Sequence, residues 1–93
     1  MAFFVGSGSY QKAFETTLNP SSVNAGSYSV ETLTVTGIGD EANAVLVTMP
    51  SLEAGVFLIG SQITDNNTLQ IVLFNSTAAP VNPASQTVKI LVF

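Results

Sequence analysis

Side chains that could carry out acid–base chemistry are few in this 93-residue chain. It has six carboxylates and two lysines, and it lacks histidine, cysteine and arginine. One adjacent pair of carboxylates, Asp40-Glu41, could in principle act as an acid and a base. Neighbouring carboxylates in a glycine-containing turn are more commonly a solvated group at the end of a strand. We therefore expect no catalytic residues, and we predict that the chain is not an enzyme.

Two loops carry the oxygen ligands that calcium prefers, residues 37–41 and Asp65-Asn66-Asn67. Calcium takes six to eight oxygens, and neither loop has the spacing of a recognised calcium-binding loop. Gly6-Ser7-Gly8-Ser9 lacks the lysine of a phosphate-binding loop and is interpreted as a flexible linker. We expect neither a metal ion nor a cofactor.

The composition points to a protein whose surface is partly covered by other molecules. Charged residues make up 9% of the chain and hydrophobic residues 46%, with a net charge of −4. Surfaces of soluble domains are usually about a quarter to a third charged. We therefore expect a subunit of a larger assembly. The shortage of basic residues argues against nucleic acid and against anionic membranes as partners. The start of the chain lacks the basic region with which a signal peptide begins. We therefore expect the protein to be made in a cytoplasm and to stay there until assembly.

Short β-rich segments separated by turn residues follow one another from Ser27 to the end of the chain. Valine, isoleucine, threonine and phenylalanine dominate them, and these residues suit pleated backbone better than helix. Asp65-Asn66-Asn67 is a hairpin signal, and residues 76–85 are too rich in proline and small residues for a strand. The pattern predicts an all-β fold, either a small antiparallel β-sandwich of the jelly-roll kind or a partly closed barrel. We expect strands at residues 27–36, 44–49, 56–64, 69–74 and 86–93.

The first 22 residues differ from the rest, and we treat residues 23–93 as the β-sandwich domain. Apolar side chains are spread among glycine and serine, and Asn19-Pro20-Ser21-Ser22 closes the segment as a turn. Two interpretations remain open, an edge strand of the same domain or an extended N-terminal arm that packs on a neighbour. The arm is favoured because its glycines weaken a strand. Its expected anchors are Phe3, Phe4, Val5, Tyr10, Phe14 and Leu18.

Three of the expected strands are apolar on both faces. A strand with one face in water alternates apolar and polar residues, whereas residues 44–49, 56–63 and 86–93 do not. One apolar face belongs to the core, and the other must meet something else. A homo-oligomer is the simplest explanation. The residues predicted for the oligomer face are Leu46, Leu58, Leu91 and Phe93.

A distinctive order of strands and turns covers about two-thirds of the chain, from Val30 onward. Its segments are Val30 to Gly37, Gly39-Asp40, Ala44 to Pro50, Leu52 to Gly55, a strand ending near Ile63, Leu69 to Ala79, and Pro83 to Val88. This order resembles a family of small β-sandwich structural proteins of tailed bacteriophages, which decorate or cement the head or belong to the tail. The N-terminal segment is not part of the resemblance.

The resemblance implies a virion protein, commonly a homotrimer, that decorates the head or belongs to tail or fibre parts. We favour a place on the capsid surface, where the protein would bind the major capsid protein. The predicted function is therefore that of a decoration or cement subunit that stabilises the phage head. The alternative is a tail, baseplate or fibre subunit that contacts a receptor. Exposed aromatic rings serve contact with sugars, and outside the arm the chain has only Tyr28, Phe57, Phe74 and Phe93. That small number argues against the alternative.

Overall fold

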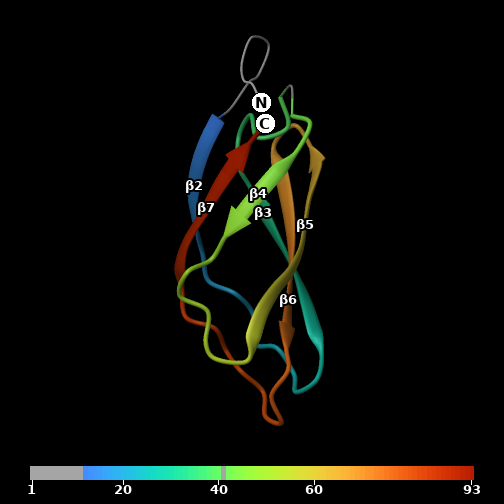
Figure 1. Cartoon of the computed structure of the whole chain (residues 1–93), viewed down its shortest axis with the longest axis vertical. Helices are drawn as coiled ribbons and strands as arrows, with labels where there is room; N and C mark the ends of the chain where they lie inside the picture. The colour runs from blue at the N-terminus through green and yellow to red at the C-terminus, as the bar shows by residue number, and fades with distance from the viewer. Residues whose placement is uncertain (1–11, 41) are drawn as a thin grey trace, which may run out of the picture.

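A computed structural model of the protein describes residues 12–40 and 42–93, which form an all-β fold (Figure 1). In this part of the chain there are six strands and no helix. All five strands expected from Ser27 onward are present, and their ends differ from the expected ones by at most two residues. The strands are β2 (Lys12–Leu18), β3 (Tyr28–Thr34), β4 (Val45–Thr48), β5 (Val56–Asp65), β6 (Thr68–Asn75) and β7 (Gln86–Val92).

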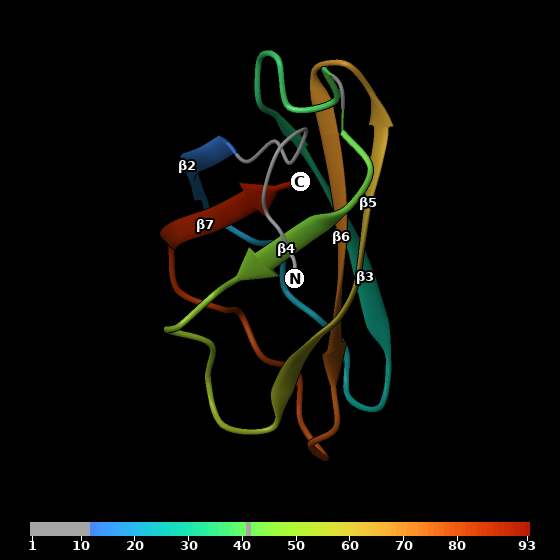
Figure 2. The same ribbon diagram turned by 45° about the horizontal axis from the view of Figure 1, so that its top comes forward.

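The strands make two antiparallel sheets of three strands each, in the orders β2-β7-β4 and β3-β6-β5. In Figure 2 the two sheets form separate layers that face one another. β7 and β6 are the central strands, and their side chains alternate between buried and more exposed positions. Such alternation places one face of each central strand against the other sheet.

A single hydrophobic core lies between the sheets and receives side chains from both. Isoleucine and leucine dominate the β6 contribution, and valine and isoleucine that of β7. Each fully buried side chain of this size stabilises the fold by about 1.5–3 kcal/mol. The most deeply buried members on the strands are Leu69, Ile71, Leu73, Val88, Ile90 and Val92.

The arm interpretation is wrong for residues 12–18, because they form β2 at the edge of a sheet. β2 pairs with β7 in register from Lys12↔Val92 to Leu18↔Gln86. Phe14 and Leu18 pack against the core and are therefore not anchors for a neighbouring subunit. The glycines that argued against a strand end at Gly8, before β2 begins. The other expected anchors, Phe3, Phe4, Val5 and Tyr10, lie outside the described residues.

The β5–β6 hairpin turn is held against the loop that follows β3, at the end of the molecule where β7 finishes (Figure 1). The N–H of Val35 donates to the carbonyl of Asn67 at 2.7 Å, and the N–H of Gly39 donates to the carbonyl of Asn66 at 3.0 Å. Gly39 approaches the turn so closely that a Cβ atom there would lie 2.7 Å from the carbonyl oxygen of Asp65. The glycine is therefore required by the packing of backbone on backbone.

Replacing Gly39 with alanine is expected to lower the free energy of unfolding by about 2 kcal/mol, because backbone atoms must move apart to admit the methyl group. Urea unfolding followed by circular dichroism measures the change. Thr36→Ala, an exposed position in the same loop, is the matched control and should stay within about 0.5 kcal/mol of the parent protein. Equal stability of Gly39→Ala and the parent would contradict the close approach.

At the opposite end of the molecule, the fully buried Asn75 ties three segments together. Its Nδ2 donates to the carbonyl oxygens of Val23 at 3.0 Å and of Ala79 at 2.8 Å. Its Oδ1 accepts from the N–H of Thr77 at 2.9 Å and from the hydroxyl of Thr77 at 2.7 Å. The amide side chain is therefore fully hydrogen-bonded and fixes the start of the long 76–85 loop against the 19–27 loop.

Candidate interaction surfaces

The titratable groups of the described residues are spread over the fold. Lys12 Nζ lies 3.8 Å from Asp40 Oδ2, and both side chains are substantially exposed, so this ion pair contributes little to stability. The pKa of Asp65 is lowered, first because the N–H of Asn67 donates to its Oδ1 at 2.8 Å and then because of a hydrogen bond from the Thr68 side chain. No group of three or more histidine, cysteine, aspartate or glutamate residues in the described ranges could hold a metal ion.

Two further carboxylates serve the structure of loops. Glu31 is buried, and its Oε2 accepts from the N–H of Ser21 at 3.1 Å and from the hydroxyl of Ser29 at 3.3 Å. Glu53 Oε2 accepts from the N–H of Ala84 at 3.0 Å, whereas its Oε1 is buried and has no hydrogen-bond partner among the described residues. Each carboxylate fixes the backbone of a connecting segment.

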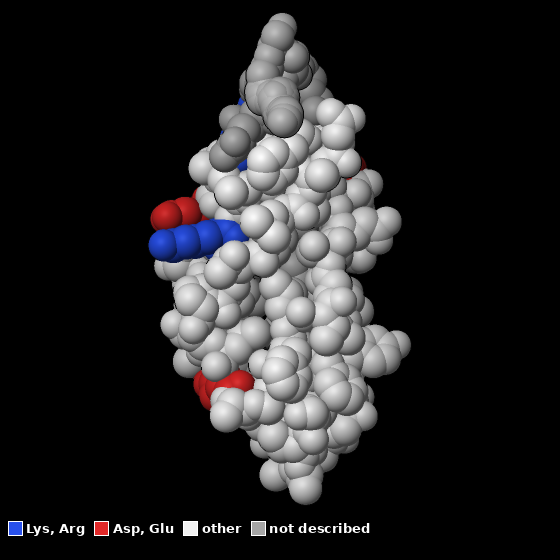
Figure 3. All heavy atoms as spheres, viewed as in Figure 1, with Lys and Arg blue, Asp and Glu red and all other residues white. Residues whose placement is uncertain are grey.

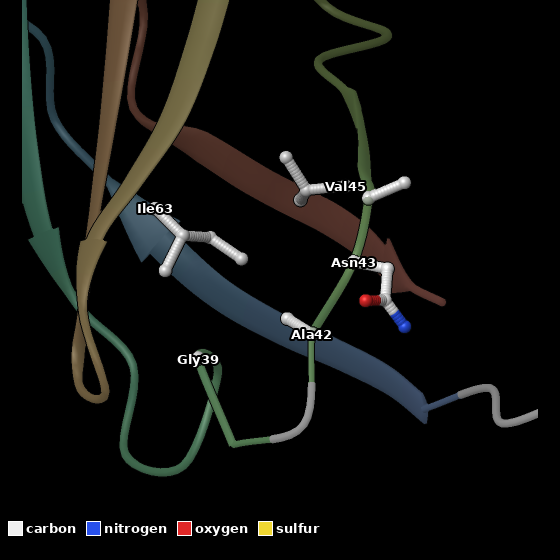
Figure 4. Close-up of a pocket in the computed structure, with 6 residues that line it drawn as sticks. Gly39, Ala42, Asn43, Val45 and Ile63 are labelled. Atoms are coloured by element: carbon white, nitrogen blue, oxygen red, sulfur yellow. The ribbon is translucent and has the colours of Figure 1, made fainter.

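A depression of about 260 Å³ lies where β4 and β5 approach each other (Figure 4). Ile63 of β5 and Ala42 of the loop before β4 point toward the space between them, and the Asn43 side chain points away from Ile63. Gly39, Ala44 and Val45 complete the lining. Because the lining has no titratable side chain, the depression can hold a small apolar group but offers no acid or base.

Charged side chains leave most of the face in Figure 3 uncovered. Blue and red atoms lie close together at one edge, and the area between that edge and the opposite one is largely white. On the outer face of the β2-β7-β4 sheet, Glu15 and Lys89 are direct partners across β2 and β7, an arrangement in which opposite charges attract. The face seen in Figure 3 is therefore largely uncharged.

Three of the four residues predicted for an oligomer face lie together on the outer side of the β2-β7-β4 sheet. Leu46 is 55% exposed and pairs across the strands with Leu91, which in turn pairs with Ala13 of β2. Phe93 follows β7, and its N–H donates to the carbonyl of Ala44 at 2.9 Å. These residues form one small apolar area, here named the leucine patch: Ala13, Leu46, Leu91 and Phe93.

The prediction for Leu58 is wrong, because this side chain packs against the core. Leu58 pairs in register with Leu73 of β6, which is fully buried, so both face inward. The neighbouring Phe57 and Ile59 face outward instead and are 54% and 59% exposed. In the sequence both faces of β5 begin with apolar residues, and only the register of β5 with β6 decides which face points into the core.

The outer side of the β3-β6-β5 sheet carries a larger apolar area that the sequence analysis did not assemble. Tyr28, Phe74 and Phe57 are register partners across the three strands and form an aromatic row. A second row lies two positions further along the strands and consists of Val30, Val72 and Gly60. We name the six exposed or half-exposed side chains the aromatic patch: Tyr28, Val30, Phe57, Ile59, Val72 and Phe74.

The outer face of the same sheet turns polar beyond the aromatic patch. The next outward partners across the strands are Thr32, Gln70 and Gln62. The row after that consists of Thr34, Thr68 and Asp65, and Asp65 is its one charged residue. No charged residue lies in the aromatic patch or in the row of Thr32, Gln70 and Gln62 beside it. A signal for the patch exists in the sequence, because Tyr28 and Val30, Phe57 and Ile59, and Val72 and Phe74 are each two residues apart. That these three pairs form one surface follows only from the order of the strands in the sheet, β3-β6-β5.

No protein-family model matches the chain, and no curated protein or solved structure matches it. In the two described ranges, no helix is long and apolar enough to cross a membrane.

Proposed function

We propose that this chain is a structural subunit of a virion, a decoration or cement protein that stabilises the head shell of a tailed bacteriophage. In this proposal the two sheets form a β-sandwich that assembles with further copies of itself, binds the major capsid protein and lies on the capsid surface. The resemblance implies a trimer as the form of this assembly. The mechanism is burial of apolar surface, repeated over many copies.

The observation that supports the proposal is the presence of apolar side chains on the outer faces of both sheets. Leu46 on one sheet and Tyr28 on the other are each more than half exposed. Contiguous apolar areas on a soluble domain commonly mark interaction surfaces. A subunit with partners on two sides can bind a shell through one face and its own copies through the other.

A second function has one specific observation in its favour. Of the four aromatic residues that lie outside the first 22 residues, Tyr28, Phe57 and Phe74 lie in one row across a sheet. The faces of aromatic rings can pack against the C–H bonds of a sugar, and Gln62 and Gln70 on the same face can donate to hydroxyl groups. A tail or fibre subunit that contacts a glycan receptor is therefore the alternative.

The number of copies in a particle separates the two functions. We expect virions purified by density-gradient centrifugation from cells that produce this chain to contain hundreds of copies per particle, because a cement protein follows the shell lattice. Quantitative mass spectrometry against the major capsid protein measures the ratio. A few tens of copies or fewer would favour the tail subunit, and absence from purified particles would overturn both.

A further inference from the structure

The aromatic patch offers a surface that is suited to contact with a second copy of this chain. We propose that two copies pair face to face through the outer side of the β3-β6-β5 sheet, around a two-fold axis. This inference rests on the proposed structural role, because it names the surface through which copies of the subunit meet, but it replaces the trimer that the resemblance implies with a two-fold pair. It assigns the contact to a different sheet from the one that carries the leucine patch.

Charge favours this face for self-association. The chain has a net charge of −4, so two copies repel each other at long range. The aromatic patch contains no charged residue, and its neighbours Thr32, Gln70 and Gln62 are neutral. On the outer side of the other sheet, the pair that follows Ala13↔Leu91 along the strands is Glu15↔Lys89. Self-pairing through that sheet would therefore bring charged side chains close to the contact. Two copies therefore meet at lowest electrostatic cost through the aromatic patch.

The exposed area is of the size that a symmetric contact needs. Tyr28 is 64% exposed, and together with Phe57 it leaves roughly 230 Å² of aromatic surface in contact with water if a buried ring covers about 200 Å². With the four remaining side chains the patch reaches roughly 450–500 Å², near the upper end for a monomer surface. Two such patches pressed together bury about 900–1,000 Å² in total, the size of a weak, reversible interface.

The shape of the patch is complementary to itself. Its large row is Tyr28, Phe74 and Phe57, and its small row is Val30, Val72 and Gly60. Gly60 leaves a notch beside Val72, since a Cβ atom built there would lie 3.7 Å from the nearest Val72 methyl carbon. A two-fold axis that lies between the rows and across the strands places the large row of one copy over the small row of the other.

Two details of β5 fit this arrangement. The register between β5 and β6 shifts between Leu58 and Gly60, so Ile59 is an extra residue in the strand and is pushed outward between the two rows. Around the proposed axis, Phe57 of one copy covers the Gly60 notch of the other, and the two Ile59 side chains meet near the axis. Face-to-face sheets pack about 10 Å apart with side chains that interdigitate in this manner.

Symmetry also favours a pair over a ring built from both patches. A closed trimer brings two different surfaces together around a three-fold axis, whereas a two-fold contact uses the same surface twice. The outer faces of the two sheets point away from each other, because the sheets share the core between them (Figure 2). Contact between the aromatic patch of one copy and the leucine patch of the next would therefore build an open stack.

The test is sedimentation velocity of the full chain over a concentration series from about 1 μM to 1 mM. We expect a reversible dimer of the 9.7 kDa chain. Phe57→Ser should weaken dimerisation by about 30-fold or more, as expected for a large, exposed aromatic side chain that becomes buried at an interface. Gly60→Ala should weaken it by about tenfold, because the methyl group fills the notch. Leu46→Ser, at an equally exposed position on the other sheet, is the matched control and should leave the dimer unchanged.

Gly60→Ala keeps the test decisive if Phe57→Ser fails to fold, because its added methyl group makes only ordinary contacts within the monomer. A monomer at 1 mM, a trimer, or a dimer that Leu46→Ser disrupts would overturn the proposal. A monomer that binds a neutral hexasaccharide such as cellohexaose, with Tyr28 and Phe57 perturbed in NMR titrations, would assign the patch to a glycan instead. The result is independent of particle composition, so a dimer absent from virions would overturn only the virion role.

Discussion

Asn75→Ala is expected to lower the free energy of unfolding by about 3 kcal/mol, because it removes four hydrogen bonds made by one buried side chain. In a domain of this size the loss corresponds to a fall of about 10–25 °C in Tm. The Val23 carbonyl also accepts from the N–H of Val81, and the Thr77 hydroxyl, once released from Asn75 Oδ1, can donate its one proton to the Ala79 carbonyl at 2.8 Å. Because those hydrogen bonds remain in the variant, we expect it to be destabilised but still folded. Differential scanning calorimetry measures the change.

The control for this prediction is Asn82→Ala, which changes the same residue type at an exposed position of the 76–85 loop. It should shift Tm by no more than about 3 °C, since exposed substitutions commonly stay within about 0.5 kcal/mol. Equal Tm values for the two variants would show that the buried amide does not hold the loops together.

Asn75→Asp tests the direction of the hydrogen bonds. The new carboxylate would face the Val23 and Ala79 carbonyl oxygens, to which Nδ2 now donates. Burial and these oxygens disfavour the charged form, so the folded state would bind a proton more tightly than the unfolded state. Stability of this variant should therefore rise as the pH is lowered from 7 toward 4.5, relative to the parent protein. A stability difference that is independent of pH would contradict this geometry.

Deleting residues 2–18 is expected to abolish cooperative folding, because it removes the whole of β2. The deletion breaks the pairing with β7 from Lys12↔Val92 to Leu18↔Gln86 and withdraws Phe14 and Leu18 from the core. β7 is apolar on its inner side and would become an edge strand, which favours aggregation. Thermal unfolding followed by circular dichroism would then show no cooperative transition.

The shorter deletion of residues 2–11 is the matched comparison, because it leaves every described strand in place. We expect it to unfold cooperatively, and its binding to purified shells then reports on Phe3, Phe4, Val5 and Tyr10 alone. Phe14→Ala provides a milder test of β2 and should cost about 3 kcal/mol, whereas Thr17→Ala on the exposed side of the same strand should cost little. A stable, soluble protein after deletion of residues 2–18 would contradict the role of β2.

The strands themselves could be predicted because their signals are local. Thr32 to Val35 alternates, Pro50 cannot donate to a sheet, and Asp65-Asn66-Asn67 favours a tight turn. These properties act over a few residues, so the strand positions and the hairpin were predicted correctly.

Strand pairing decided what the local patterns left open. Residues 12–18 alternate as an edge strand would, but their partner is the hydrogen-bonding edge of β7, which lies more than 60 residues later in the chain. The same holds for Leu58, whose inward position depends on its register with Leu73. Register is set by contacts between distant segments, and a shift of one residue would exchange the two faces.

By itself, the sequence determined that the chain is all-β, where its strands and turns fall, and that little of its surface is charged. The tertiary structure alone decided that Tyr28, Phe57 and Phe74 form one row, because they come from three strands joined only by the order β3-β6-β5. It also decided that Asn75 is a buried tie between loops. The physical reason is that backbone preferences act between neighbours, whereas surfaces and buried networks arise from packing between distant parts of the chain.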